Sequence, residues 1–251
     1  MSDTGSGSGT RDIDLVRVRY VDHEGTERLV RLEEAVRVPI EDGRTVRSIP
    51  SYRDQGHMPG RYWAATLGDF VEYESYLESK WLMLLDFDSD VISFATQPLE
   101  FDAVDGLGAW QHTPDVFARR RDGSVLLLDV KNPELRDEPK VQRQEERTLR
   151  ACGRLGWDYA MVSEPDGQRW VNIDLLSSAR RPLHLGEELA PRLLKLAHRP
   201  VAIGELLSFM QFPDLARGVL FHLMWFQKIV TDLDRPLRDS TMVKTAEGPR
   251  V

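Results

Sequence analysis

Two aspartates and a lysine stand at the ends of short apolar segments in the middle of the sequence. Asp115 follows a proline, and Asp129 comes directly after three leucines, with Lys131 two residues further on. Asp129 and Lys131 are two residues apart, so on a β-strand both side chains point to the same face. A carboxylate at this place can hold a divalent cation while the neighbouring ammonium group polarises water. The pattern predicts a metal-dependent phosphodiesterase site on two adjacent strands.

The residues between the two aspartates predict a β-hairpin. Residues 120–123 read Arg-Arg-Asp-Gly, which is a turn signal between the apolar segments 116–118 and 125–128. Antiparallel pairing would bring Asp115 close to Asp129. An uncompensated charge after three leucines would be costly, which favours a metal ligand. The structural alternatives are an Asx turn at Asp115 and a solvated strand end at Asp129 and Lys131.

The available ligand types favour a hard cation. Carboxylate oxygens prefer Mg²⁺ or Mn²⁺ to zinc, and the sequence has one cysteine and no cluster of cysteines and histidines. A third carboxylate is expected from a helix predicted over 71–86, whose apolar residues recur at three- and four-residue spacing. Glu74 and Glu78 are comparable candidates on this helix. The common fate of either residue would be an exposed helix surface.

Strands and helices in mixed order predict an α/β sheet with helices on its faces. Strands are expected over 13–21, 28–32, 91–94, 99–101, 116–118, 125–128 and 159–162, and a second helix over 139–155. The strands 91–94 and 99–101 are expected to pair with each other. Residues 1–10 are rich in Gly and Ser and predict a disordered tail, which leaves 11–179 as the first domain.

Beyond residue 180 the pattern becomes helical. Helices are expected over 189–196, 203–209 and 215–229, followed by a short β wing within 231–243. This predicts a winged-helix-like domain over 180–251. Residues 200–251 hold six acidic and six basic residues, and the segment 217–228 is mostly apolar. A DNA-reading helix would carry several polar or basic side chains on one face, so a protein partner is favoured for this domain.

Composition limits the classes of function. The net charge of −8 argues against a general nucleic-acid coat but not against a local basic track. The loop predicted over 41–67 offers such a track, with aromatic residues among its arginines. The candidate DNA contacts are Arg44, Arg47, Arg53 and Arg61, although arginines also simply keep exposed loops soluble. The single cysteine and the absence of a long apolar run predict a cytoplasmic protein without a membrane span.

Four motifs occur in an order that resembles the TnsA family, the endonuclease subunits of heteromeric transposases. They are Glu78 before an apolar run, Gln97-Pro98, Pro114-Asp115 and Asp129-Val-Lys131. The resemblance covers roughly residues 45–165 and is weaker in the C-terminal part. It implies a restriction-endonuclease-like core of the PD-(D/E)xK type and selects Glu78 over Glu74.

The resemblance also implies site residues and partners. Glu78, Asp115 and Lys131 would be catalytic, with Asp129 at the variable acidic position, and Mg²⁺ or Mn²⁺ would be held by Glu78, Asp115, Asp129 and the Val130 carbonyl. Gln97 would lie outside the ligands, either holding a water of the metal shell or supporting the backbone. The implied substrate is double-stranded DNA at transposon ends, in a bacterial protein associated with the nucleoid when acting, with a TnsB-like recombinase and a TnsC-like ATPase as partners. Alternatives are a non-catalytic adaptor between these partners and a stand-alone restriction or defence nuclease.

Overall fold

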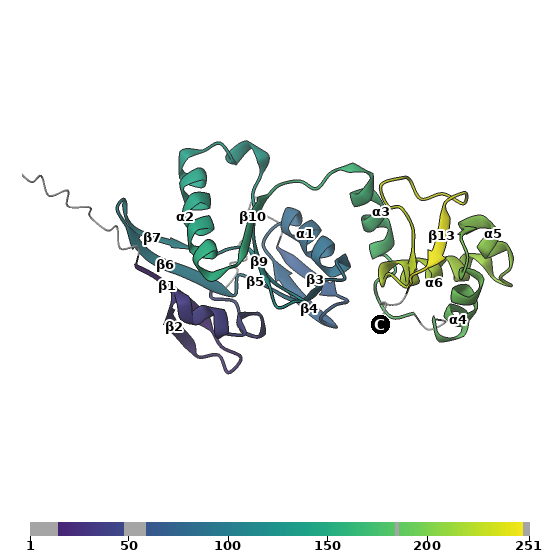
Figure 1. Cartoon of the computed structure of the whole chain (residues 1–251), viewed down its shortest axis with the longest axis horizontal. Helices are drawn as coiled ribbons and strands as arrows, with labels where there is room; N and C mark the ends of the chain where they lie inside the picture. The colour runs from purple at the N-terminus through teal and green to yellow at the C-terminus, as the bar shows by residue number, and fades with distance from the viewer. Residues whose placement is uncertain (1–14, 48–58, 184–185, 248–251) are drawn as a thin grey trace, which may run out of the picture.

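The structure, a computed structural model, describes residues 15–47, 59–183 and 186–247 (Figure 1). In these ranges the chain is a mixed α/β protein with several separate sheets. The central sheet has the strand order β10-β9-β8-β5 and carries the residues predicted to do chemistry. Its strands are β5 (Val91–Thr96), β8 (Val116–Arg120), β9 (Val125–Val130) and β10 (Asp158–Val162).

The predicted hairpin is confirmed. Strands β8 and β9 pair antiparallel with Val116 opposite Leu128, so Asp115 lies beside the end of β9 that carries Asp129. Helix α2 (Pro139–Leu155), which matches its predicted range, connects β9 to β10, and these two strands are parallel. The candidate residues therefore lie where β8 begins and β9 ends.

Alternation along β8 and β9 divides their side chains between two cores. Val116 and Leu128 pack with Leu82 of α1 (Tyr76–Phe87). Phe117 and Leu127 pack instead with residues of α2 and of a second sheet. Because Asp129 is two residues from Leu127, its side chain starts on the α2 side of the sheet.

The second sheet has the strand order β2-β1-β6-β7 and lies at the α2 end of the molecule (Figure 1). Its strands are β1 (Leu15–Val21), β2 (Glu27–Arg31), β6 (Leu99–Asp105) and β7 (Gly108–His112). The expected pairing of 91–94 with 99–101 is wrong, because β5 pairs with β8 while β6 pairs with β1 and β7. Gln97, with a φ of 48°, stands where the chain passes between the two sheets.

Two further sequence predictions need correction near the site. The helix predicted from residue 71 begins at Tyr76, because residues 69–73 form strand β4. The segment 41–67 was expected to be a loop, but it contains β3 (Gly60–Ala64), which pairs antiparallel with β4 (Asp69–Tyr73). Short 3₁₀ helices occur at η1 (Leu32–Arg37), η2 (Ile40–Asp42) and η3 (Pro133–Leu135).

The C-terminal part combines three helices with a small sheet of order β11-β13-β12. Its elements are α4 (Gly186–Leu196), β11 (Val201–Ala202), α5 (Ile203–Ser208), α6 (Pro213–Trp225), β12 (Ile229–Val230) and β13 (Met242–Thr245). The three expected helices are present, but the third ends at Trp225 and not at residue 229. Residues 229–230 form β12, which pairs with β13, so the first strand of the pair lies before the range 231–243 that was predicted for it.

Helix α3 (Gly167–Ser177), which was not predicted, joins the two parts of the chain (Figure 1). Its Ile173 and Leu176 belong to the same apolar core as α6. The ring of Phe87 at the end of α1 meets Trp225 edge-on at 5.2 Å between centroids. The central sheet and the C-terminal part therefore share a continuous apolar contact. No helix in the described ranges is long and apolar enough to cross a membrane.

Candidate active site

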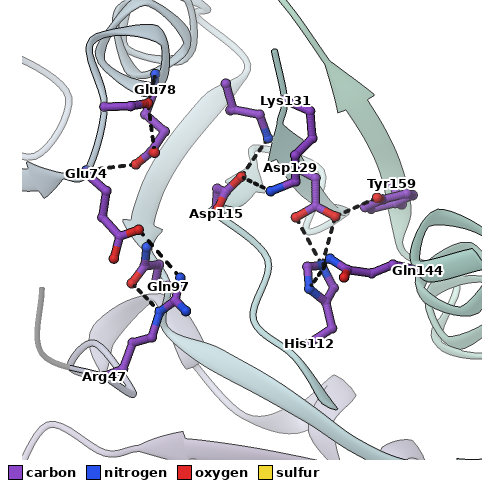
Figure 2. Close-up of polar contacts among 12 residues, drawn as sticks. Arg47, Glu74, Glu78, Gln97, His112, Asp115, Asp129, Lys131, Gln144 and Tyr159 are labelled. Carbon is purple, nitrogen blue, oxygen red and sulfur yellow. Dashed lines mark hydrogen bonds and ion pairs between the residues drawn. The ribbon is translucent and has the colours of Figure 1, made fainter. Parts of the chain in front are cut away.

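A pocket of about 600 Å³ lies at the end of the central sheet where β8 begins and β9 ends. Three separate elements supply the chemically relevant side chains around it. The residues that matter for the argument are Arg47, Glu74, Glu78, Asp115, Val130 and Lys131. The structure thus brings together Glu78 of α1, Asp115 directly before β8 and Lys131 directly after β9, which is the set that the resemblance implied, but without Asp129 (Figure 2).

Asp115 is the buried carboxylate at the centre of this group. It is 6 % exposed, and its Oδ2 accepts a hydrogen bond of 2.7 Å from the backbone N–H of Val130. The Nζ of Lys131 lies 3.6 Å from the same oxygen. Burial raises the pKa of Asp115 above its ordinary value, and the nearby Lys131 ammonium only partly opposes this effect. Asp115 is therefore a carboxylate whose charge would be stabilised by a further cation.

Glu78 closes the first turn of α1 and faces the same pocket. Ser75 is the N-cap of the helix and accepts a hydrogen bond from the Glu78 N–H. The Glu78 carboxylate accepts hydrogen bonds from the Ser75 hydroxyl and the Glu74 N–H, both at 2.9 Å. These contacts resemble a capping box, except that the Glu78 carboxylate accepts from the N–H of Glu74 in place of that of Ser75, and they stabilise the helix start without any ligand. Glu78 is 6 % exposed, so the expectation of an exposed helix glutamate does not hold.

Burial raises the pKa of Glu78 to about 7, and the proximity of Asp115 acts in the same direction. Two buried carboxylates that face one pocket disfavour each other's charge. A divalent cation between them would stabilise both ionised forms, and the donors here are all oxygens. The described residues contain no group of three or more Asp, Glu, His or Cys side chains placed to hold a metal ion. A metal ion at this site would therefore be held by two carboxylates and the Val130 carbonyl, and its other coordination positions would be filled by water or substrate.

Replacement of Glu78 by glutamine should stabilise the protein at alkaline pH. The pKa of Glu78 is raised from 4.5 to about 7, so the cost of its charge is absent below about pH 4.5 and complete above about pH 7. We expect Glu78→Gln to increase the free energy of unfolding by up to about 3 kcal/mol at pH 8 and by little at pH 4. Urea unfolding at both pH values measures this difference. Equal effects at the two pH values would contradict the raised pKa.

Asp129 occupies a different environment from the other candidates. It is fully buried, and its two carboxylate oxygens lie 3.0 and 2.8 Å from Nε2 of His112. The hydroxyl of Tyr159 donates a further hydrogen bond of 2.6 Å (Figure 2). Burial acts to raise the pKa of Asp129, but the hydrogen bond from His112 and the charges around it hold it below its ordinary value. The described residues that line the pocket at Asp115 do not include Asp129.

The partners of Asp129 were not found from the sequence. His112 lies at the end of β7, in the second sheet, and reaches Asp129 across the boundary between the sheets. Gln144 of α2 lies 2.6 Å from Nδ1 of His112, which leaves the Nε2–H to donate to Asp129. Only the tertiary arrangement reveals this network, since its members come from four elements.

The four candidate DNA-contact arginines divide into different settings. Arg47 lines the pocket, where its Nε donates to Gln97 Oε1 at 3.1 Å. Arg44 hydrogen-bonds to the His23 carbonyl and does not line this pocket. Arg61 stacks on the ring of Phe70 at 4.6 Å. Arg53 lies outside the described residues.

A scan against protein-family models and a search of curated proteins found no match for this chain. The family resemblance in the motifs therefore remains an expectation from the sequence.

Proposed function

We propose that the chain is a metal-dependent DNA endonuclease of the TnsA type. The observation that carries the proposal is the convergence of Glu78, Asp115 and Lys131 on one pocket from three elements. In this proposal the central sheet with α1 and α2 is a restriction-endonuclease-like core, and residues 180–251 form a winged-helix-like domain that binds a protein partner.

Each residue has a distinct part in the proposed reaction. Asp115, Glu78 and the Val130 carbonyl would hold Mg²⁺, or Mn²⁺ in its place, which would supply Lewis acidity to the scissile phosphate and lower the pKa of a bound water. The Lys131 ammonium can donate hydrogen bonds to that water and to the phosphate oxygens that gain charge in the transition state. Asp115, 3.6 Å from Lys131 Nζ, keeps the ammonium directed into the pocket.

Asp129 is assigned a structural part within this proposal. Its oxygens are engaged by His112 and Tyr159, so it anchors the end of β9 and thereby the positions of Val130 and Lys131. The metal-ligand set is then smaller than the motif pattern suggested. The implied partners remain a TnsB-like recombinase and a TnsC-like ATPase, acting on double-stranded DNA at transposon ends.

A second candidate function is a non-catalytic adaptor between recombinase and ATPase subunits. The specific observation in its favour is that Glu78 and Asp129 both have hydrogen-bond partners without a metal. Glu78 accepts from the Glu74 N–H and the Ser75 hydroxyl, and Asp129 is held by His112 and Tyr159. The raised pKa values of Glu78 and Asp115 favour the nuclease, because an adaptor has no use for this cost.

The proposed activity can be tested with the purified full chain and supercoiled plasmid DNA. We expect conversion to the nicked form in Mn²⁺ or Mg²⁺, none in EDTA, and none with Asp115→Asn in any metal. The partner proteins are added in a parallel reaction if the chain alone is inactive. Metal-independent nicking, or equal nicking by Asp115→Asn, would contradict the proposal. Inactivity in all reactions, with partner binding retained, would favour the adaptor.

A further inference from the structure

Arg47 is held at the edge of the pocket by contacts on two sides. Its Nε donates to Gln97 Oε1 at 3.1 Å, and its Nη2 lies 3.5 Å from Glu74 Oε2 (Figure 2). Its side chain is nevertheless 52 % exposed. A guanidinium group has five N–H donors in a planar fork, so these two contacts leave donors for a ligand. The arrangement fixes the orientation of the fork while keeping it accessible.

Gln97 connects this arginine rigidly to the candidate metal ligands. Its backbone N–H donates to the Asp115 carbonyl at 3.0 Å, and its own carbonyl accepts from the Val46 N–H at 2.9 Å. The residue before Arg47 and the residue that carries the central carboxylate are thus both tied to Gln97. On the other side, the backbone N–H of Glu74 donates to Glu78. Arg47 is therefore positioned relative to both Asp115 and Glu78.

Gln97 carries two unfavourable features that a purely structural residue would be expected to lose. It adopts a φ of 48°, in the left-handed region that disfavours non-glycine residues. It is 1 % exposed, and its Nε2 is a buried donor with no hydrogen-bond partner among the described residues. If the side-chain amide were turned over, Nε2 would face the Arg47 N–H, which is also a donor, so the amide nitrogen would still lack an acceptor. Such costs concentrate at functional sites, where geometry matters more than stability.

The chemistry of this corner favours an anionic ligand with paired oxygens. A guanidinium fork binds phosphate in a bidentate manner, and the ion pair with Glu74 is half-exposed and therefore weak. A phosphate can bind the remaining N–H donors of Arg47 while Gln97 and Glu74 hold the guanidinium in place. Lys131 lies on the same pocket, so Arg47 and Lys131 together provide two cations around the acidic pair.

We propose that Arg47 binds a phosphate of the DNA strand adjacent to the scissile phosphate, and that Gln97 and Glu74 are positioning residues that direct its guanidinium into the pocket. This inference rests on the proposed function, since it assumes that DNA is the substrate. In this inference Gln97 contributes to DNA binding by orienting Arg47, and it does not contact the metal.

The test measures binding of a fluorescein-labelled DNA duplex to the full chain by anisotropy, with Ca²⁺ in place of Mg²⁺ and over a range of salt concentrations. Arg47→Ala should weaken binding about tenfold and reduce the slope of log affinity against log salt by about one. Arg47→Lys should keep the slope and recover part of the affinity, because the charge remains but the fork is lost. Arg37→Ala, at an exposed arginine of η1 away from the pocket, is the matched control and should change neither quantity.

Gln97→Asn tests the positioning part, because asparagine tolerates the left-handed conformation while its shorter side chain no longer reaches Arg47. It should weaken binding in the same direction as Arg47→Ala, and the double variant should be no weaker than Arg47→Ala alone. Wild-type binding and an unchanged salt slope for Arg47→Ala would overturn the inference. Additive losses in the double variant would overturn the part assigned to Gln97.

The failure of the inference is distinguishable from that of the proposed function. DNA binding without cleavage under any metal or partner condition would contradict the nuclease proposal and leave the Arg47 contact standing. A wild-type chain that does not bind DNA, alone or with partners, would overturn both. Thermal melting of each variant shows whether it is folded. If Gln97→Asn does not fold, the binding of Arg47→Ala still shows whether Arg47 contacts a phosphate.

Discussion

Lys131→Ala is expected to reduce DNA-strand cleavage by at least about 10²-fold while leaving metal binding intact. Loss of a group that stabilises transition-state charge typically costs a factor of about 10²–10³ in rate. The Nζ of Lys131 lies 3.6 Å from Asp115 and is itself a positive charge, so its removal does not take away a ligand. Single-turnover cleavage in Mn²⁺ measures the first quantity, and calorimetry of Mn²⁺ binding measures the second.

Lys140→Ala is the matched control, because Lys140 is an exposed lysine at the start of α2. It should cleave DNA at the wild-type rate. Equal rates for Lys131→Ala and Lys140→Ala would remove Lys131 from the proposed chemistry. If Lys131→Ala also lost Mn²⁺ binding, the substitution would have disturbed the structure at the end of β9, and its effect on the rate could not be assigned to Lys131 alone.

Asp129→Ala is expected to destabilise the fold by about 3–5 kcal/mol, which is the usual consequence of removing one member of a buried polar or charged pair. The change leaves the His112 ring and the Tyr159 hydroxyl without the acceptor that they share. Tyr159→Phe removes only one hydrogen bond and should cost about 1 kcal/mol. Urea unfolding of the three proteins at neutral pH gives the comparison.

The same variants decide whether Asp129 is a metal ligand. If it is structural, Asp129→Asn keeps its size and should retain Mn²⁺ affinity while it loses stability. Loss of Mn²⁺ binding with unchanged stability would instead place Asp129 in the ligand set, as the motif pattern suggested. His112 would then have to release the carboxylate when the metal binds.

The chemistry at the ends of β8 and β9 could be predicted because it depends on local patterns. A turn signal between two apolar segments set the register of the hairpin, and the register alone brings Asp115 to the end of β9. Helix α2 was equally predictable, since Pro139 stands at its first position and Gly156 adopts the left-handed conformation after its end. These two elements could be predicted because turn and capping residues next to them in the sequence determine where they begin and end.

The remaining features depend on contacts between distant residues. The helix containing Glu78 was predicted from residue 71, but residues 71–73 belong to β4, whose strand conformation depends on its pairing with β3. The separation of β5 and β6 into different sheets depends on β1 from the start of the chain. For the same reason the sequence could not show that Asp129 is held by His112, or that Gln97 contacts Arg47 fifty residues away.

The most direct test of the account is Mn²⁺ binding to the wild-type chain and to Asp115→Asn, measured by calorimetry at pH 8 in the presence of a DNA duplex. The duplex is included because substrate phosphates can complete the coordination of such an ion. We expect saturable binding to the wild type and its loss in Asp115→Asn, with both proteins folded. Equal binding to the two proteins, or none to the wild type, would contradict a metal site at Asp115.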